Sequence, residues 1–361
     1  MTHRFAKLRR RHALQLLAGA SSAVLLHACG GGEPDSAAES EAESTEATEE
    51  SAAGSPEPTM SMTLGTAPWV GQVPLYIAQE KGFFEEEGLD FELRNFGDSG
   101  GYLSAFLSDN LDSVSIVSSE AITLADSGKD YKIVLIQDNS VGGDGILAKD
   151  SIASIEDFAG KQVAVDTSGV SYFFLLQVLK EAGLSQDDIT VVNTDPAAAA
   201  AAFQSNNADI AVTYAPYLQQ AADEVADGRI IYDSSEMPTA IIDLYVFDAA
   251  YVENNPEAVQ AFVNGIFKGL KFLEESPEEA LAIGAAALDV EPEDVASDLE
   301  GVKLPDQATN IEMMAEPESD LYVVGPLEDL AEFLVSEDQI AAAPSDIAGS
   351  LDPQFVEAAT F

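Results

Sequence analysis

Short apolar runs alternate with amphipathic stretches over residues 62–247, and this alternation restricts the fold more than any other feature. The runs have the length and β-branched content of strands, whereas the stretches between them carry apolar residues at helical spacing. Such alternation favours right-handed β-α-β units, so we predict an α/β fold with mainly parallel sheets and helices on both faces. The predicted strands are 62–66, 89–95, 113–117, 132–136, 145–149, 162–166, 189–192, 210–213 and 241–247. The predicted helices between them are 75–84, 102–108, 121–125, 170–182, 196–204 and 217–226.

After Asn255 the pattern becomes entirely helical. Pro256 and Pro277 stand where the first turn of a helix accepts proline. Asp195 precedes a run of six alanines at 197–202, and its carboxylate can cap the helix that this run opens. The C-terminal part is therefore predicted to be a helical segment.

Two α/β lobes fit this order of elements. The first lobe is expected to comprise residues 61–148 and 240–361, and the second to comprise residues 149–239. The chain would cross between them at Lys149-Asp150 and return along the strand 241–247. Two crossings form a hinge, and the cleft between α/β lobes is the expected ligand site.

Residues 1–28 have the character of a signal peptide. Five cations within residues 4–11 precede an apolar stretch at 13–26 that is too short and too interrupted to span a membrane. The stretch ends in LHACG, which resembles a bacterial lipobox, so Cys29 is the expected lipid-bearing first residue of the mature chain. An ordinary secretory signal that contains a Cys is the alternative. The pair Arg10-Arg11 leaves both the Sec and the twin-arginine export routes open.

The segment that follows Cys29 has the composition of a linker. Residues 30–60 hold nine carboxylates, no Lys or Arg, and otherwise small residues and prolines. Such a segment cannot bury enough apolar surface to offset the entropy lost on ordering. We therefore predict a disordered acidic linker over 29–60 that holds the folded part near a membrane.

The chain is strongly acidic, with 64 Asp and Glu against 16 Lys and Arg and a formal net charge of −48. Residues 61–361 alone carry 11 cations and 55 acids, which gives 11 − 55 = −44. A charge of this sign excludes nucleic acid as a partner, because polyanions repel such a surface. It favours adaptation to high salt, where screening weakens the repulsion. A protein family that simply runs acidic is the alternative.

Histidine and cysteine are almost absent from the mature chain. The three His are His3, His12 and His27, and the single Cys is Cys29. Removal of the signal peptide leaves no His, and lipidation occupies the thiol, so Ser-His-Asp, His-metal and thiol chemistry are excluded. Paired carboxylates, as in a secreted glycosidase, and a Ser-Lys arrangement stay open, but no motif selects either. We therefore predict a protein that is not an enzyme and that uses no cofactor or metal.

Four segments resemble a known family. They are WVGQVPLYIA at 69–78 with KGFF at 81–84, DNSVGGDG at 138–145, DFAGK at 157–161, and ADIAV at 208–212 with YAPY at 214–217. In this order they resemble the ABC-transporter substrate-binding proteins of the nitrate/sulfonate/taurine group, which includes binders of thiamine pyrimidine precursors. The resemblance spans most of residues 61–361.

The resemblance implies a two-lobed, type II periplasmic-binding-protein-like fold and a solute-binding function. Such a protein captures a small polar molecule, such as a sulfonate, taurine or nitrate, and delivers it to an ABC permease driven by its ATPase. The chain would be a monomer, exported and held by lipid at the outer face of the cytoplasmic membrane, periplasmic or cell-surface. Alternatives are a binder of a thiamine-precursor-type pyrimidine or another small nitrogen compound, and a surface or adhesive lipoprotein without a transport role.

The candidate ligand-binding residues follow predicted strands, at the edge where α/β sheets place their ligands. They are Trp69, Gln72, Ser99, Gly100, Ser118, Ser119, Glu120, Asp138, Asn139, Asp144, Thr167, Ser168, Ser171, Tyr214 and Asp243. Trp69 could form a stacking wall for the ligand or be a core aromatic. Ser99 and Gly100 open a helix whose free N–H groups could hold an anion, or Asp98 could simply cap that helix.

The segments expected to line the cleft are 66–74, 97–102, 118–120, 137–145, 167–172 and 213–217, and none of them contains Lys or Arg. An anionic ligand would therefore be held by helix N-termini and hydroxyls, and not by a guanidinium. The acids Glu120, Asp138, Asp144 and Asp243 would suit a zwitterion such as an aminosulfonate, with its amine on a carboxylate. The alternative is that a chain so rich in acids places them there by chance.

Overall fold

The computed structural model describes residues 60–361. The predicted signal peptide, the predicted lipid site Cys29 and the predicted linker up to residue 59 lie outside these residues. Met60 already belongs to the first strand, which begins two residues before its predicted start at Met62. None of the helices described for residues 60–361 combines the length and the apolar character that a membrane crossing requires.

Six strands form the first sheet, in the order β11-β4-β10-β3-β1-β2. They are β1 (Met60–Thr66), β2 (Leu89–Asn95), β3 (Ser113–Val117), β4 (Tyr131–Ser140), β10 (Ile242–Asp248) and β11 (Val302–Lys303). β1 runs parallel to β2 and β3, whereas β10 lies antiparallel between β3 and β4. This sheet and the helices that cover it are called the first lobe.

Five strands form the second sheet, in the order β7-β6-β8-β5-β9. They are β5 (Asp144–Lys149), β6 (Gln162–Val165), β7 (Thr190–Asn193), β8 (Ile210–Tyr214) and β9 (Gly228–Asp233). β6 runs parallel to β7 and β8, and β5 runs antiparallel to β8 and β9. This sheet and its helices are called the second lobe.

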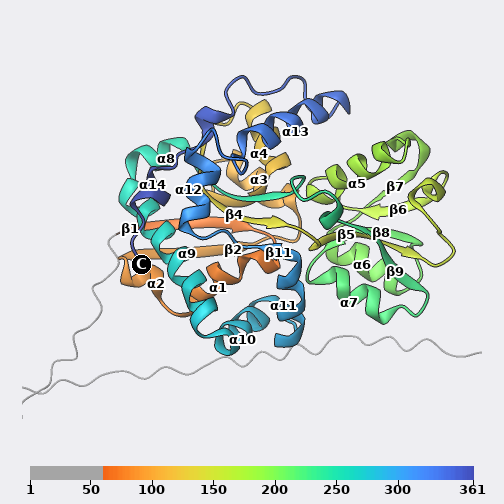
Figure 1. Ribbon diagram of the computed structural model, residues 1–361, viewed down its shortest axis with the longest axis horizontal. Helices are drawn as coiled ribbons and strands as arrows, with labels where there is room; N and C mark the ends of the chain where they lie inside the picture. The colour runs from red at the N-terminus through yellow and green to blue at the C-terminus, as the bar shows by residue number, and fades with distance from the viewer. Residues whose placement is uncertain (1–59) are drawn as a thin grey trace, which may run out of the picture. The chain divides into compact units, whose positions relative to one another are not determined.

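Helices cover both faces of each sheet (Figure 1). In the first lobe α4 and α13 pack together on one face, and α1 and α9 pack together on the other. In the second lobe α5 covers one face, and α6 and α7 cover the other. The helices of the first lobe are α1 (Val73–Glu80), α2 (Phe83–Glu86), α3 (Ser99–Leu107), α4 (Ser118–Asp126), α8 (Ala249–Asn254), α9 (Pro256–Glu275), α10 (Pro277–Leu288), α11 (Pro292–Asp298), α12 (Gln307–Ala315), α13 (Val324–Ser336) and α14 (Gln354–Ala358). Those of the second lobe are α5 (Val170–Glu181), α6 (Pro196–Gln204) and α7 (Tyr217–Glu224).

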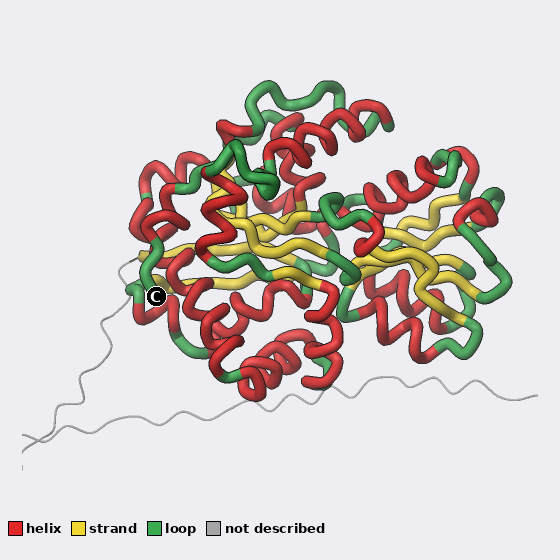
Figure 2. Tube along the Cα trace, in the orientation of Figure 1, coloured by secondary structure: helices red, strands yellow, loops and turns green. Residues whose placement is uncertain are grey.

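The α/β fold class and the two lobes are confirmed (Figure 2). The sheets are mixed and not mainly parallel, since parallel and antiparallel pairings occur in both. The reason is the interlobe crossing. The chain leaves the first sheet at the end of β4 and enters the second sheet in β5, and it returns in β10 against the direction of its neighbours. The predicted crossing at Lys149-Asp150 is therefore too late, because β5 belongs to the second sheet from Asp144 onward. The strands β9 and β11 were not predicted.

Several helix ends are determined by local sequence signals. Asp98 and Asp195 cap α3 and α6, each by accepting a backbone N–H at 2.8 Å. Pro256 and Pro277 stand in the first turns of α9 and α10, as predicted. The predicted helix 75–84 is divided into α1 and α2, because Gly82 between them has a φ of +73°, which favours glycine.

The core of the first lobe is built around β10. This strand lies in the middle of its sheet and is buried on both faces, which explains its unbroken apolar run. The ring of Tyr245 packs edge-on against Phe262 of α9 at 5.0 Å, and Phe262 also stacks on Phe84 of α2. Burial of each such ring contributes about 2–3 kcal/mol. The core thus holds rigid the sheet edge from which the candidate ligand-binding residues project.

Candidate functional site

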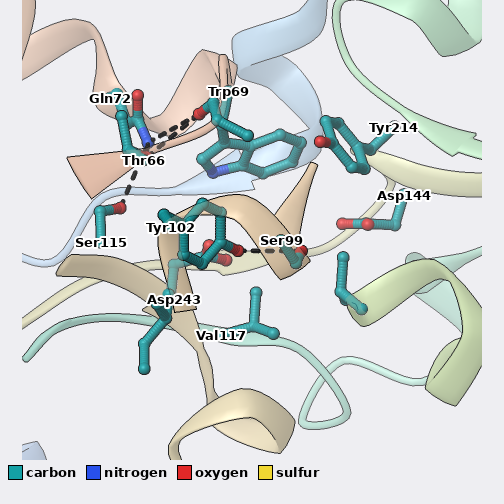
Figure 3. Close-up of a pocket in the computed structure, with 13 residues that line it drawn as sticks. Thr66, Trp69, Gln72, Ser99, Tyr102, Ser115, Val117, Asp144, Tyr214 and Asp243 are labelled. Carbon is teal, nitrogen blue, oxygen red and sulfur yellow. Dashed lines mark hydrogen bonds between the residues drawn. The ribbon is translucent and has the colours of Figure 1, made fainter. Parts of the chain in front are cut away.

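A small cavity lies where side chains from both lobes meet (Figure 3). Its volume is about 40 Å³, which is room for about three water molecules. Polar and aromatic side chains form most of its wall, and its lining includes neither Lys nor Arg. The lining residues are Thr66, Ala67, Trp69, Gln72, Ser99, Tyr102, Ser115, Ile116, Val117, Asp144, Val170, Tyr214 and Asp243.

Trp69 forms one wall of the cavity together with Tyr214 of the second lobe. The two rings meet edge to face, with centroids 5.9 Å apart and an interplanar angle of 88°. The indole N–H donates to Asp138 Oδ2 at 2.9 Å, which fixes the ring. Gly143 allows this position, because a Cβ there would lie 2.5 Å from the indole. Trp69 is only 7% exposed, so it is a core aromatic and a cavity wall at once.

Gln72 belongs to a buried hydrogen-bond network beneath the cavity. Its amide nitrogen donates to Thr66 Oγ1 and, at 3.2 Å, to Ser115 Oγ, and its oxygen accepts from Tyr76 at 2.7 Å. Ser115 in turn donates to Gln137 Oε1 at 2.6 Å. Internal partners thus satisfy the polar atoms of Gln72. The arrangement indicates that Gln72 positions the cavity floor.

Asp138 and Asp243 lie side by side on β4 and β10, directly opposite each other in register. Asp138 accepts hydrogen bonds from Trp69 and, at 3.0 Å, from Gln137. Burial raises the pKa of Asp138 to about 6. Burial and then the charge of Asp138 raise the pKa of Asp243 well above its usual range. Because ionisation of both neighbouring carboxyls would bury two like charges, this environment favours the protonated form of one of them.

Glu120 and Asp144 complete a group of four buried carboxyls. Glu120 accepts from the Tyr102 hydroxyl at 2.8 and 3.0 Å and from the Val117 N–H at 3.1 Å. Asp144 lies opposite Tyr214 in the second sheet. Burial raises the pKa of both carboxyls to about 7. We call Glu120, Asp138, Asp144 and Asp243 the buried carboxyl group.

The two lobes touch closely beside the cavity. The N–H of Gly100, in the first turn of α3, donates to Ser168 Oγ of the second lobe at 3.2 Å. Ser168 Oγ also donates to Asp166 Oδ1 at 2.6 Å. A Cβ on Gly169 would lie 2.1 Å from Ser99 Oγ, so glycine is required for this approach. The contacts are those of lobes closed on one another.

Six of the residues predicted from the sequence line the cavity: Trp69, Gln72, Ser99, Asp144, Tyr214 and Asp243. Four others stand close to them. Glu120 and Asp138 are bonded to the lining residues Tyr102 and Trp69, and Gly100 and Ser168 are bonded to each other between the lobes.

The remaining predicted residues lie outside the cavity lining. The side-chain amide of Asn139 donates to the carbonyl of Pro238 at 2.6 Å, near the second crossing. Ser118 Oγ accepts the N–H of Ile242 at 3.5 Å and so joins α4 to β10.

Three further predicted residues, Ser119, Thr167 and Ser171, also lie outside the cavity lining. The carbonyl of Ser119 accepts from Thr123 within α4, and the N–H of Thr167 donates to Asn193 Oδ1 at 3.0 Å. Ser171 Oγ is buried in α5 and has no hydrogen-bond partner among the described residues. A role for any of these in ligand binding stays a prediction.

The sequence reasoning missed several lining residues: Thr66, Ala67, Tyr102, Ser115, Ile116, Val117 and Val170. Two of them carried a signal. Tyr102 lies one helical turn after Ser99, and its hydroxyl oxygen lies 3.0 Å from Ser99 Oγ, so helical spacing could have found it. Ser115 is a polar residue in the middle of the apolar run of β3, which is unusual for a fully buried strand.

No group of His, Cys, Asp or Glu within residues 60–361 has an arrangement suited to a metal ion. The buried carboxyl group therefore does not have the geometry of a metal-coordinating cluster. Glu120 and Asp138 accept hydrogen bonds from neutral donors, and burial raises the pKa of all four carboxyls, which favours protonation over metal binding.

Comparison with known proteins identifies the family. The description NMT1/THI5-like matches residues 69–280, which is more than half of the chain. The chain belongs to the NMT1/THI5-like family. A Brucella abortus (strain 2308) binding protein is 30% identical over 222 residues, which cover 60% of this chain and 67% of that relative. The taurine-binding periplasmic protein of Escherichia coli (strain K12) is 23% identical over 299 residues, or 79% of this chain and 89% of that protein.

Solved structures share the fold of this family member. The alkanesulfonate-binding protein SsuA from Xanthomonas axonopodis pv. citri, bound to MOPS, is 18% identical with a TM-score of 0.67. The match covers 82% of this chain and 99% of that chain. The desulfurization enzyme DSZB also has this fold, at 15% identity and a TM-score of 0.59 over 82% of this chain and 98% of its own. At these identities the likeness concerns the fold alone, and the same scaffold hosts both binding proteins and an enzyme.

Proposed function

We propose that this protein is the solute-binding component of an ABC importer and captures a small polar molecule between its lobes. The observation that carries the proposal is the cavity itself. Both lobes contribute to its wall, with Trp69 and Asp243 from the first and Asp144 and Tyr214 from the second. A ligand that touches both lobes favours the closed state over the open one by its differential contacts.

The closed arrangement has contacts that opening would break. Besides the bond from Gly100 to Ser168, the ammonium of Lys180 on α5 lies 2.8 Å from Glu337 Oε1 at the end of α13. Apolar contacts join the lobes as well, among them the edge-to-face pair of Trp69 and Tyr214. The hinge would be the two crossings, between β4 and β5 and before β10.

The ligand class follows from the relatives of this family. Relatives are named for taurine and for aliphatic sulfonates, and a nitrate-binding protein from Synechocystis PCC 6803 shares the fold. The cavity is small and is lined by both lobes, so a larger solute of this class would require the lobes to separate before it enters. We propose a small sulfonate, taurine, nitrate or a small nitrogen compound such as an aminopyrimidine as the cargo.

The proposal includes export and a membrane anchor. The taurine-binding relative is periplasmic, which supports export of this chain. Lipidation of Cys29 would hold the receptor near the permease, and the acidic segment up to residue 59 would act as its tether. Labelling with a radioactive fatty acid tests the anchor: Cys29→Ser is expected to lose the label and to release the protein into the medium or periplasm.

Binding is favoured over catalysis, although the fold also occurs in an enzyme. The sequence has no His or Cys after residue 29, so thiol nucleophiles and imidazole bases are missing from residues 60–361. The buried carboxyls could move protons, and the hydroxyls of Ser99 and Tyr102 lie beside Glu120, but no imidazole is present to activate either hydroxyl. Recovery of an unchanged solute after prolonged incubation with the protein tests this reading.

Ligand-dependent stability tests the function. A solute that binds only the native state raises the free energy of unfolding by about 2.7 kcal/mol at a concentration of 100 times Kd. We expect at least one of taurine, ethanesulfonate, nitrate and 4-aminopyrimidine to raise the melting temperature, and calorimetry to give one site per chain. Trp69→Ala is expected to abolish that shift. If no member of this panel changes the melting temperature, the proposed ligand classes are wrong.

A further inference from the structure

The cavity is lined by acids and has no cation to balance them. Asp144 and Asp243 line it directly, and Glu120 and Asp138 hydrogen-bond to lining side chains. Of the cations in residues 60–361, seven form ion pairs, and every acid in those pairs lies outside the buried carboxyl group. No Lys or Arg is among the groups that influence the pKa of any of the four.

Two carboxylate oxygens in this group lack a hydrogen-bond partner within the described part of the chain. They are Asp243 Oδ2 and Asp138 Oδ1, in residues that are 7% and 0% exposed. Asp243 is also a cavity-lining residue. A buried acceptor without a donor costs about 1–3 kcal/mol, and no N–H or hydroxyl group of the described residues donates to these two oxygens beside the ligand space.

The protein itself occupies part of the expected anion site. The first turn of α3 was predicted to offer free N–H groups to an anionic head. In the structure Gly100 donates its N–H to Ser168, and Gly101 donates its N–H to Asp98. At the start of α4, the N–H of Val117 is donated to Glu120. A simple anion would therefore meet carboxyls beside the cavity and would not find these three N–H groups free.

We propose that the solute carries a cationic nitrogen, an ammonium or an amidinium, which donates to Asp243 and Asp144. This inference rests on the proposed solute-binding function and narrows its ligand class. The rings of Trp69 and Tyr214 beside these acids add cation–π attraction. An aminosulfonate meets the requirement through its amine, whereas nitrate and simple alkanesulfonates do not.

Protonation supports the same conclusion. The pKa values of Glu120 and Asp144 stand at about 7, so near neutral pH the empty cavity retains protons that neutralise its acids. A bound cation would replace those protons. Binding is therefore expected to release protons to the buffer and to tighten as the pH rises from 6 to 8.

Matched pairs of probes test the proposal with the full mature chain. Each pair differs in the nitrogen group: taurine and ethanesulfonate, 4-aminopyrimidine and 4-hydroxypyrimidine, ethanolamine and ethylene glycol. Nitrate is added alone. We expect that in any pair that binds, the nitrogen member binds at least about tenfold more tightly, and that its calorimetric heat depends on the ionisation heat of the buffer. If ethanesulfonate or nitrate binds as tightly as any nitrogen member, the proposal of a cationic solute is wrong, whereas the proposed solute-binding function is supported.

A second measurement decides the matter even if no probe binds. Asp243→Asn and Asp144→Asn each remove a buried carboxyl whose ionisation destabilises the empty protein. Each variant is therefore expected to raise the melting temperature of the unliganded chain at pH 8. The matched control Asp320→Asn, at an exposed position, should leave it unchanged. If the two cavity variants instead melt lower than the parent, these carboxyls serve the fold and the proposal is overturned. If no probe binds and both cavity variants are stabilised, the proposed ligand panel is wrong, and the gain in stability supports a cavity that favours a cationic solute.

Discussion

The acids around the cavity and the acids on the surface are chemically the same, yet the protein shifts their pKa values in opposite directions. Burial raises the pKa of Glu120 and Asp144 to about 7. On the surface, hydrogen bonds from Arg94 lower the pKa of Glu92, and hydrogen bonds from Ser185 lower the pKa of Asp188. The lesson is that the acidity of this chain has two meanings. The surface acids determine the net charge of the protein, whereas the buried acids determine which solutes the cavity favours.

The largest expected effect tests whether the buried acids act only when the lobes close. Gly169→Ala places a Cβ 2.1 Å from Ser99 Oγ and 2.8 Å from Glu120 Oε1, so the lobes cannot approach fully. The affinity for a ligand bound by both lobes is expected to fall by about tenfold or more, because the closed state is less populated. The melting temperature of the empty protein should change little.

Gly97→Ala is the matched control for this variant, since a Cβ there meets nothing within 4 Å. It should bind as the parent does, by calorimetry with whichever probe of the panel binds. Unchanged affinity in Gly169→Ala would show that the ligand is held without this interlobe contact.

The second prediction concerns pH. Glu120 and Asp144 have folded-state pKa values of about 7 against ordinary values of 4.5 and 3.8. Their protonated forms favour the native state, so this contribution is present at low pH and is lost as the pH rises through about 7. The free energy of unfolding of the empty protein should therefore fall between pH 5 and pH 8, on the order of 3 kcal/mol per group.

Several groups face these two acids and share the effect. Asp166 lies near Glu120, Asp138 lies near Asp144, and the Tyr102 hydroxyl donates to Glu120. Denaturant titrations of Asp144→Asn at each pH should give a shallower slope than those of the parent, whereas Asp320→Asn should keep the parent slope. Equal slopes in all three proteins would mean that the surface acids alone produce the pH dependence.

The third prediction addresses the surface acids by themselves. Residues 61–361 carry 11 − 55 = −44 charges, and their repulsion is screened as salt shortens the Debye length from about 10 Å at 0.1 M to about 3 Å at 1 M. Thermal melting should shift upward over this range of NaCl. The shift should be equal in Asp144→Asn, because buried groups are screened little. A salt response that differs between the two proteins would contradict the division between surface and cavity.

The smallest effect is expected at an exposed ion pair. Lys81 lies 2.8 Å from Glu279, with side chains 31% and 59% exposed. Lys81→Ala should cost only about 0.5 kcal/mol, measured by urea denaturation. Lys129 is the contrast, since it is 10% exposed and contacts both Asp109 and Asp248. If Lys129→Ala costs no more than Lys81→Ala, burial does not strengthen ion pairs in this protein.

Much of the fold could be predicted because its signals are local. The strands 89–95 and 113–117 and the helix 196–204 lie where the apolar spacing put them. Strand direction could not be predicted in this way. β10 has the apolar run of a buried strand in either orientation, and only the path of the chain between the lobes makes it antiparallel to β3 and β4.

Some residues of the candidate site could likewise be predicted from local signals, and others could not. Position after a strand identified Trp69, Ser99 and Asp144, since strand ends converge at one edge of a sheet. Asn139 satisfies the same rule, yet its amide is bonded to the Pro238 carbonyl outside the cavity lining. Tyr102 fails the rule and lines the cavity, because helix α3 turns it back over Ser99.

The sequence by itself determined the α/β class, the two lobes, the family resemblance and the lack of histidine and thiol chemistry beyond residue 29. These follow from residue types and their spacing, which are properties of the chain before it folds. Only the tertiary structure decided which acids are buried together, which helix N–H groups are already bonded, and that Asp138 and Asp243 lie opposite each other. The physical reason is that desolvation and cross-strand contact depend on segments more than a hundred residues apart, as β4 and β10 are.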